Sequence, residues 1–211
     1  MKNIEINTHS SIRIEGEKTL YFDPFRIEEK PLDADIIFIT HDHYDHWDLS
    51  SVLNICKEGT RIIAPKSSES AILEKRIRGV TYMFLNPNEA LNVDDIKIRT
   101  IPAYNLSKPF HPKANSWLGY IVTMDGVSYY VAGDTDCTEE LLKVKADVAF
   151  LPVGGKYTMD YKEAATAISQ MDVKRAIPTH YGSIVGSLDE GKKFREELKK
   201  LRPSIQVELK I

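Results

Sequence analysis

The chain has 211 residues, and its 28 Lys and Arg against 31 Asp and Glu give a formal net charge of −3. Apolar residues make up 42% and charged residues 28%, which are ordinary values for a globular protein long enough to bury a large core. We expect one domain over residues 1–211, and the net charge gives no general attraction to nucleic acid or to an anionic membrane.

The sequence also lacks the usual signals for export or membrane insertion. No apolar run approaches the length of a membrane span, and the first residues lack the apolar region of a secretion signal. Cys56 and Cys137 are the two cysteines and are far apart, as is common in a reducing compartment. We therefore expect a cytoplasmic protein that takes a small-molecule substrate, with no membrane or nucleic-acid partner and with self-association left open.

Residue patterning predicts mainly strands in the first half of the chain. The strands are expected over residues 4–7, 11–14, 19–22, 35–39, 61–64, 80–85, 89–93 and 96–101. A helix is expected over residues 49–56, with Asp48 or Ser50 as its cap, and a second from Pro65 to about Arg78.

The second half begins with an irregular, proline-containing segment at residues 102–114 and then alternates strands with helices. Strands are expected over residues 117–124, 127–132, 146–151, 173–177 and 205–209, and helices over 138–145, 160–171 and 188–201. Asp125 and Gly126 separate the first two of these strands and are typical of a tight hairpin. This element order alone predicts an α/β or α+β fold.

The turn after the strand at residues 35–39 carries the pattern H-x-H-x-D-H, made of His41, His43, Asp45 and His46. Imidazole nitrogen and carboxylate oxygen are ligands for zinc, manganese and iron. The competing interpretation is a solvated charged turn. Chance would produce the pattern in such a chain only on the order of a few times in ten thousand, so metal binding is favoured. Side chains that converge on a turn from two directions suit two metal ions better than one.

Two other apolar strands also end in polar residues. Asp134 follows the strand at residues 127–132, and His180 follows the strand at residues 173–177. Alone, Asp134 would be interpreted as a turn or cap residue and His180 as an ordinary loop histidine. Because chemistry collects at the carboxyl ends of strands in sheet-based enzymes, the two together could supply the bridging carboxylate and distal imidazole of a two-metal site.

These motifs resemble the metallo-β-lactamase fold superfamily over almost the whole chain. Within it, the chain looks most like the compact metal-dependent hydrolases related to L-ascorbate-6-phosphate lactonase. The phrases similar to that branch are Gly133-Asp134-Thr135-Asp136, Leu151-Pro152-Val153-Gly154-Gly155, Tyr157-Thr158-Met159 and Pro178-Thr179-His180-Tyr181-Gly182. The resemblance implies a four-layer αββα sandwich.

The resemblance also implies a role for each residue of the motifs. It assigns His41 and His43 to a first metal, Asp45, His46 and His180 to a second, Asp134 to a bridge between them, and Asp23 to the orientation of a ligand histidine. The chain departs from the superfamily at its third motif, where a histidine is usual. The matching stretch offers Asn105 instead, and His111, six residues later, is the other candidate.

The function implied is hydrolysis at two divalent metal ions. Zinc is favoured by the nitrogen ligands, and manganese or iron by the carboxylates. A metal-bound hydroxide would attack a lactone, ester or phosphoester, with an anionic small substrate preferred by analogy. Asp45 and Asp134 are the catalytic candidates. The residues considered for substrate contact or support of the site are His9, Asn105, Lys156, Tyr157 and Tyr181.

Two other functions fit the same motifs. One is a nuclease, which the absence of a basic stripe disfavours. The other is a metal-binding or ligand-sensing module with little catalysis, which the missing third-motif histidine favours. The retained bridging carboxylate, Asp134, and the full H-x-H-x-D-H pattern count against the sensing module.

Overall fold

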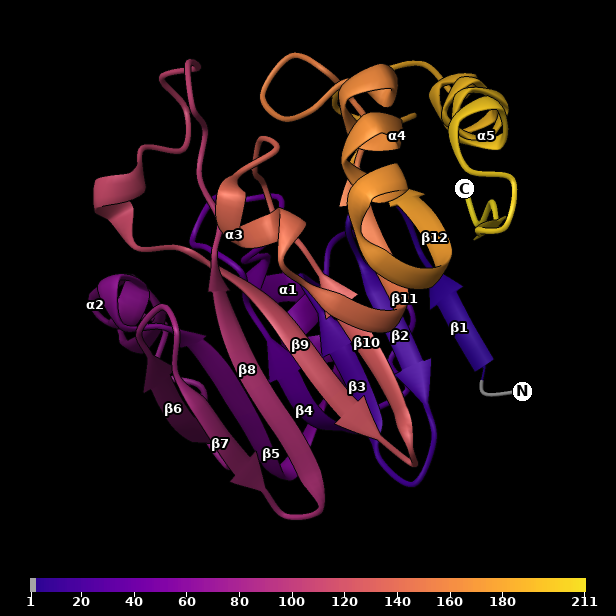
Figure 1. The fold of residues 1–211 in the computed structure, drawn as a ribbon. Coiled ribbons are helices and arrows are strands. Elements are labelled where there is room, and N and C mark those ends of the chain that lie inside the picture. The colour runs from indigo at the N-terminus through magenta and orange to yellow at the C-terminus, as the bar shows by residue number, and fades with distance from the viewer. Residues whose placement is uncertain (1–2) are drawn as a thin grey trace.

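The computed structural model describes residues 3–211 and contains two β-sheets packed face to face (Figure 1). The first sheet has six strands in sequence order. They are β1 (Asn3–Ile6), β2 (Ile12–Glu15), β3 (Thr19–Phe22), β4 (Ala34–Phe38), β5 (Cys56–Pro65) and β6 (Thr81–Leu85). Strands β1 to β3 are antiparallel, whereas β3, β4, β5 and β6 run parallel to one another.

The second sheet has seven strands in the order β13-β12-β11-β10-β9-β8-β7. They are β7 (Ala90–Val93), β8 (Ile96–Pro102), β9 (Leu118–Met124), β10 (Val127–Val131), β11 (Lys145–Pro152), β12 (Asp172–Thr179) and β13 (Gln206–Val207). Strands β7 to β10 form an antiparallel meander, and β10 to β13 are parallel. Both sheets therefore contain parallel strands, whose carboxyl ends share an edge.

Helices cover the outer faces of both sheets. They are α1 (Leu49–Ile55), α2 (Glu69–Leu73), α3 (Glu139–Leu142), α4 (Tyr161–Gln170) and α5 (Glu190–Leu201), with 3-10 turns at Lys66–Ser68 and Lys113–Asn115. None of the helices within residues 3–211 is long and apolar enough to cross a membrane.

The expected elements are present, with differences in their bounds. The predicted helix to Arg78 ends at Leu73, because Arg76 adopts a left-handed backbone conformation with φ of 49° that a helix cannot contain. Strand β5 begins at Cys56 rather than at residue 61. Thr60 explains the earlier start, since its hydroxyl accepts from the backbone N–H of Lys57 and donates to the carbonyl of Ala34 on β4.

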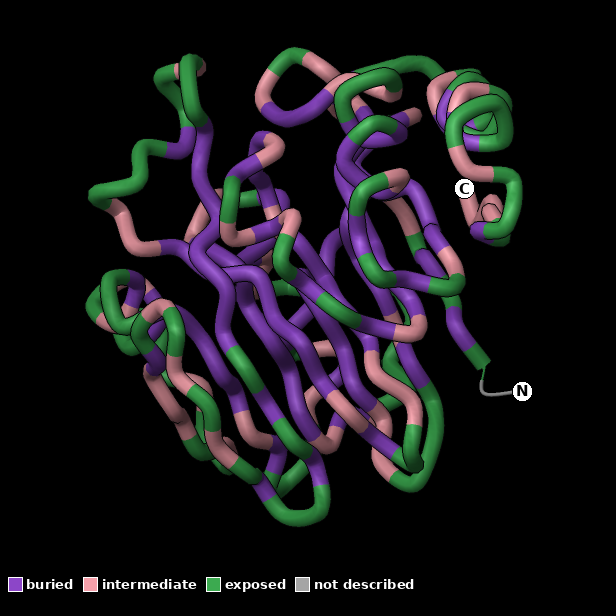
Figure 2. The backbone as a smooth tube through the Cα atoms, in the orientation of Figure 1, coloured by how far each residue is buried: buried purple, intermediate pink, exposed green. Residues whose placement is uncertain are grey.

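The core has three apolar layers, and in Figure 2 much of the backbone of the strands is coloured as buried. The central layer lies between the sheets. There the ring of Phe38 stacks on that of Phe22, with centroids 4.7 Å apart, and contacts the ring of Tyr120 of the second sheet, with centroids 5.2 Å apart. A second layer joins the outer face of the second sheet to α3, α4 and α5. A third joins the outer face of the first sheet to α1 and α2. The order of layers is αββα, which confirms the expected four-layer metallo-β-lactamase sandwich.

The two sheets are tied together at the edge where the polar strand ends lie. The hydroxyl of Tyr120 donates to the carbonyl oxygen of Ile39 over 2.8 Å, and the backbone N–H of Leu118 donates to the carbonyl of Thr40 over 3.1 Å. Ile39 and Thr40 directly precede the H-x-H-x-D-H motif. These two hydrogen bonds therefore fix the start of the motif against the opposite sheet.

We predict that Tyr120→Phe lowers the free energy of unfolding by about 1–3 kcal/mol, because the buried carbonyl of Ile39 loses the hydroxyl that donates to it. Urea unfolding at a fixed metal concentration measures the change. Tyr161→Phe, on the partly exposed start of α4, is the control and should change the stability by less than about 0.5 kcal/mol. Equal losses in the two variants would contradict the role given to the Tyr120 hydroxyl.

Candidate metal centre

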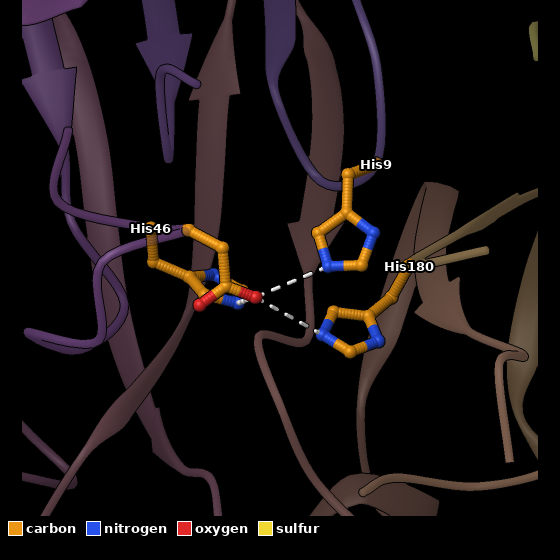
Figure 3. A group of neighbouring side chains, drawn as sticks. His9, His46 and His180 are labelled. Atoms are coloured by element: carbon orange, nitrogen blue, oxygen red, sulfur yellow. Dashed lines mark hydrogen bonds and ion pairs between the residues drawn. The ribbon is translucent and has the colours of Figure 1, made fainter. Parts of the chain in front are cut away.

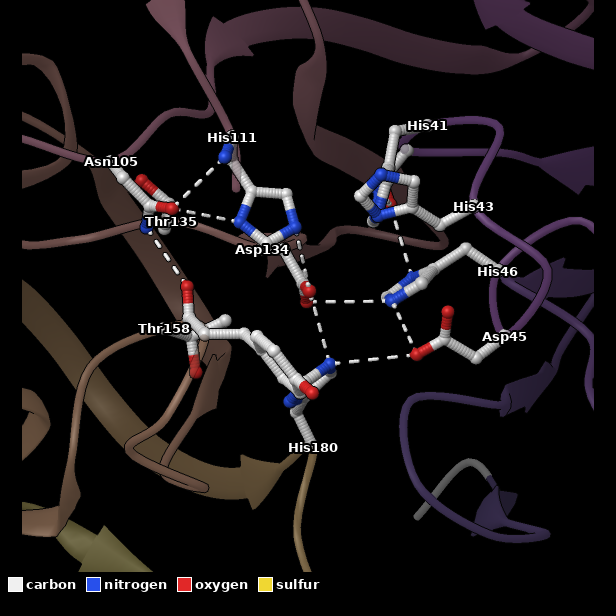
Figure 4. A network of polar contacts seen from close by, with 12 residues as sticks. His41, His43, Asp45, His46, Asn105, His111, Asp134, Thr135, Thr158 and His180 are labelled. Carbon is white, nitrogen blue, oxygen red and sulfur yellow. Dashed lines mark hydrogen bonds and ion pairs between the residues drawn. The ribbon is translucent and has the colours of Figure 1, made fainter. Parts of the chain in front are cut away.

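All six histidines of the chain gather in one cluster at the common edge of the two sheets; Figure 4 labels five of them, and Figure 3 labels the sixth, His9. The cluster has three overlapping groups whose nitrogen and oxygen atoms lie within 4.8 Å of one another and could hold a metal ion. The groups are His41, His43 and His111; His9, Asp45, His46 and His180; and His41, His46 and Asp134. They come from the loop after β1, the turn after β4, the loop after β8, and the ends of β10 and β12.

In the first group, His41 Nε2 and His43 Nδ1 lie 3.0 Å apart. The neighbouring hydroxyl of Thr40 determines the tautomer of His41. Thr40 Oγ1 donates to Asp23 Oδ2 over 2.7 Å, so it accepts from His41 Nδ1, which lies 3.0 Å away. The Nε2 lone pair of His41 is thereby directed toward His43. The indole ring of Trp117 packs against both imidazoles, with ring centroids 4.7 and 4.8 Å away.

His111 joins this group, and Asn105 holds it in place. The side-chain N–H2 of Asn105 donates to Asp136 and to the carbonyl of Tyr157, so its Oδ1 faces His111. That oxygen accepts from His111 Nδ1 over 2.9 Å and from the His111 backbone N–H over 3.0 Å. The Nε2 lone pair of His111 therefore points into the cluster. Of the two candidates for the third motif, the structure places the imidazole among the possible ligands and the amide behind it.

The second group surrounds the carboxylate of Asp45. Asp45 Oδ2 lies 3.2 Å from His9 Nε2, 3.6 Å from His46 Nε2 and 3.8 Å from His180 Nε2. Figure 3 shows the contacts from His9 and His180 meeting at one carboxylate oxygen. The ring centroids of His9 and His180 lie 3.9 Å apart, and the backbone carbonyl of His9 accepts a hydrogen bond from the backbone N–H of His180.

Asp134 lies between the two groups. Its Oδ2 is 3.2 Å from His111 Nε2 and 3.0 Å from His180 Nε2, and its Oδ1 is 3.4 Å from His46 Nε2. One carboxylate thus faces a histidine of the first group and two of the second. A residue placed in this way could bind a metal ion on either side.

Asp23 anchors the cluster from beneath. Its side chain is completely buried and accepts from the backbone N–H and the hydroxyl of Thr40 and from His46 Nδ1, at 2.8, 2.7 and 2.7 Å. Because the carboxylate only accepts, His46 Nδ1 carries the proton and Nε2 is free to face Asp134. Such a partner fixes the ring orientation of a metal-binding histidine.

Burial and charge control the protonation of the cluster. Burial lowers the pKa of His41 well below its usual value, and it lowers the pKa of His9 to about 4 although Asp45 opposes the shift. Burial alone would raise the pKa of Asp134, but His180 and His46 outweigh it and hold the pKa well below the usual value. Burial also opposes a charge on His46, yet Asp134 and Asp23 raise its pKa well above normal. His41 and His9 are therefore neutral and Asp134 is ionised, which are the forms that bind metals, whereas the raised pKa of His46 favours a proton that a bound cation would have to displace.

Buried polar atoms without partners test whether this cluster suits a metal ion. Four of them face one another in its centre and have no partner in hydrogen-bond geometry within residues 3–211: His46 Nε2, His111 Nε2, His180 Nε2 and Asp134 Oδ1. Leaving such groups unpaired costs about 1–3 kcal/mol each. Cations held by the two groups would give all four atoms a partner, so the residues present fit a metal site.

A cavity of about 230 Å³ opens beside these atoms. Its lining residues are His43, Tyr44, Asp45, Phe110, His111, Asp134, Tyr157, His180 and Ile184. Of the residues considered for substrate contact, Tyr157 lines the cavity, and His9 is fully buried behind Asp45. Lys156 lies over the ring of Tyr157 at 5.0 Å, outside the set of lining residues. Tyr181 is fully buried, and its hydroxyl faces Gly191 of α5.

Several residues that shape the site were not singled out from the sequence. They are Thr40, Asp136 and Trp117 around the histidines, and Tyr44, Phe110 and Ile184 in the cavity wall. Thr40 and Tyr44 lie within or beside the H-x-H-x-D-H motif, and Phe110 directly precedes His111. For these three residues, the only feature of the sequence that could have indicated a role in the site is their position next to a proposed ligand.

The similarity to known proteins extends over most of the chain. A family model described as a beta-lactamase superfamily domain matches residues 2–181. A UPF0173 metal-dependent hydrolase of Pyrococcus furiosus is 34% identical, with 95% of this chain and 96% of the relative covered. A second UPF0173 metal-dependent hydrolase, from Thermococcus onnurineus, is 31% identical over 99% of this chain and 100% of the relative.

Solved structures with the same fold include further hydrolases. A protein of Parabacteroides distasonis described as a metal-dependent hydrolase has a TM-score of 0.81 and 30% identity, covering 99% of this chain and 92% of that one. A metallo hydrolase of Ignicoccus hospitalis has a TM-score of 0.77 at 22% identity, with coverage of 99% and 94%. The diiron β-hydroxylase CmlA of Streptomyces venezuelae also reaches 0.77, at 14% identity over 100% of this chain and 52% of that one. The last two show the fold alone.

We predict that His111→Ala lowers the bound metal per chain, whereas Asn105→Ala keeps the ligands and weakens metal affinity by about 10–100-fold through loss of ring orientation. Elemental analysis of the purified proteins and competition with a chelator measure the two effects. Asn115→Ala, in the 3-10 turn at Lys113–Asn115, is the control for the amide substitution. Metal content and affinity that are unchanged in His111→Ala would remove His111 from the set of ligands.

Proposed function

The chain belongs to the metallo-β-lactamase superfamily as a metal-dependent hydrolase, and from this premise we propose that it cleaves a lactone, ester or phosphoester bond of a small molecule with two divalent metal ions. Zinc is our first choice for both ions because six of the eight possible ligands are imidazoles; manganese or iron would suit the carboxylates. The observation that carries the proposal is the set of four unpartnered polar atoms that meet beside an open cavity.

The arrangement of the groups supports two ions. His41, His43 and His111 would hold one, and Asp45, His46 and His180 the other, with Asp134 shared between them. His9 is the fourth member of the second group, and its contact with Asp45 orients that carboxylate. When bound, the ions would lower the pKa of a water molecule to near neutrality and stabilise the oxyanion that forms during hydrolysis.

The residues of the chain supply the remaining steps. Asp45 and Asp134 both line the cavity, and their carboxylates accept hydrogen bonds, so they can orient an attacking water. His9 Nε2 donates to Asp45 Oδ2 over 3.2 Å and holds this carboxylate toward the cavity. Tyr44, Phe110, Tyr157 and Ile184 form the rest of the wall and exclude water around the bond that breaks.

The same observations support a small-molecule substrate in the cytoplasm. Cys56 and Cys137 do not form a disulfide with each other, as suits a reducing compartment. A cavity of about 230 Å³ without a lysine or arginine among its lining residues offers the neighbouring phosphates of a nucleic-acid backbone no cationic side chain, which disfavours the nuclease alternative.

We predict that Asp134→Asn lowers kcat/KM by at least about a thousandfold, because the shared carboxylate is lost at the point where both groups meet. The measurement is hydrolysis of a panel of aryl acetates, lactones and aryl phosphodiesters by metal-loaded protein, together with its metal content.

Asp147→Asn is the matched control. Asp147 lies near the amino end of β11, where its carboxylate accepts hydrogen bonds from Ser128 and pairs with Lys174. Its substitution should leave turnover within about twofold. Full turnover by Asp134→Asn in the presence of a strong chelator would contradict the proposed mechanism.

A further inference from the structure

Beyond the possible ligands, the cavity wall is made of aromatic and aliphatic side chains. Four of the nine lining residues are outside the metal-binding groups: Tyr44, Phe110, Tyr157 and Ile184. Tyrosine hydroxyls are the only side-chain polar groups among these four. The surface available to the part of a substrate that lies away from the reacting bond is therefore mainly apolar.

The aromatic residues line the cavity from different loops. Phe110 and Tyr157 meet edge to face, with ring centroids 4.7 Å apart and planes at 90°. Their loops are joined behind the rings, where Asn105 binds the Tyr157 carbonyl and His111, the neighbour of Phe110. Tyr44 projects from the H-x-H-x-D-H turn and is 67% exposed, while Phe110 is 40% exposed. Large aromatic surfaces left open beside a reactive centre are typical of a binding site.

Of three nearby cations, two are engaged by other side chains and the third lies over the ring of a wall residue. Lys108 contacts Asp136 at 2.6 Å, and Arg26 donates to Ser183 while its guanidinium lies over the ring of Phe25. Lys156 lies over the ring of Tyr157 and is exposed. None of the nine residues that line the cavity is a lysine or arginine. A charged group on the substrate would lose water in this cavity without gaining an oppositely charged partner from Tyr44, Phe110, Tyr157 or Ile184, which is costly.

We infer that the substrate carries an uncharged aryl or branched alkyl group beside the bond that is cleaved, and that Phe110, Tyr157 and Tyr44 select it. This inference rests on the proposed hydrolase function and departs from the anionic substrate expected by analogy. The cavity volume of about 230 Å³ lies below the roughly 300–1,000 Å³ of sites for drug-sized ligands, so the group is small, on the order of one ring.

The test compares kcat/KM for 4-isopropylphenyl acetate and 4-carboxyphenyl acetate, which present groups of similar shape with and without a charge. The carboxylated ester has the better leaving group, so its intrinsic reactivity works against the inference. We expect at least a tenfold preference for the uncharged ester in the wild type, in line with what a few wall contacts can discriminate. A preference for the charged ester would overturn the inference.

Substitutions in one loop test whether Phe110 is responsible for the preference for the uncharged ester. Phe110→Lys removes an aromatic surface and adds a cation, so it should shift the ratio toward the charged ester by at least tenfold. Leu106→Lys is the matched control, since Leu106 is 63% exposed in the same loop and does not line the cavity; it should leave the ratio unchanged. An equal shift in both variants would mean that general surface charge governs the choice. A selective fall in kcat/KM for the charged ester in Lys156→Gln would assign recognition of an anion to Lys156. This result, like an equal shift in the two lysine variants, would contradict the inference.

Binding measurements separate this inference from the proposed function. Ligand-observed NMR with benzyl alcohol and metal-loaded protein should show binding that Phe110→Lys weakens at least fivefold and Leu106→Lys does not. If benzyl alcohol binds in this way while no ester, lactone or phosphodiester is cleaved, the wall selects apolar groups and the hydrolysis proposal fails. If esters are cleaved without a preference for the uncharged member and benzyl alcohol does not bind, hydrolysis stands and the inference about the wall fails.

Discussion

The buried carboxylate of Asp23 is the interaction on which the rest of the site depends. A charge with no exposed surface is very costly unless it is fully hydrogen-bonded, and three donors, two from Thr40 and one from His46, satisfy this one. Those donors then have fixed roles. The Thr40 hydroxyl donates to Asp23 and so accepts from His41, while His46 is protonated on the nitrogen that faces Asp23. One buried charge thereby directs two imidazole lone pairs toward the same space.

On the second sheet, a neutral side-chain amide, that of Asn105, directs the lone pair of an imidazole into the same space. Asn105 turns its oxygen toward His111 because its N–H2 is held by Asp136 and by the carbonyl of Tyr157. Lys108 pairs with Asp136, so the charge behind the amide is balanced. The loop also closes on itself, since the N–H of Asn105 donates to the carbonyl of His111. The residue just before His111 is Phe110, so this one loop presents both a possible ligand and part of the cavity wall.

Local patterns predicted the α/β class and most of the possible ligands, whereas the four-layer arrangement and the division of the ligands between two ions came from the resemblance to the superfamily, and His9 was expected only as a supporting or substrate-contact residue. The H-x-H-x-D-H turn is contiguous, and Asp134 and His180 follow apolar strands that share an edge. The choice between Asn105 and His111 could not be made from the sequence, since it depends on a loop that returns over six residues through its own hydrogen bonds. Tyr181 shows the same limit. It follows His180, whose left-handed backbone, with φ of 58°, sends the next side chain toward Gly191.

The distribution of charge explains how such a site can combine a reactive centre with an apolar wall. The carboxylates of Asp45 and Asp134 and the imidazoles around them face inward, where cations would supply the charge that hydrolysis needs. Because the wall need not stabilise the reacting atoms, it is free to be built from Tyr44, Phe110 and Tyr157 for selection alone. The ligands are held by hydrogen bonds on both sheets, whereas Tyr44 and Phe110 are partly exposed side chains next to ligands in the chain. Their side chains can differ while the ligands stay in place, so relatives that share the fold and metal ligands can differ in the molecules they hydrolyse.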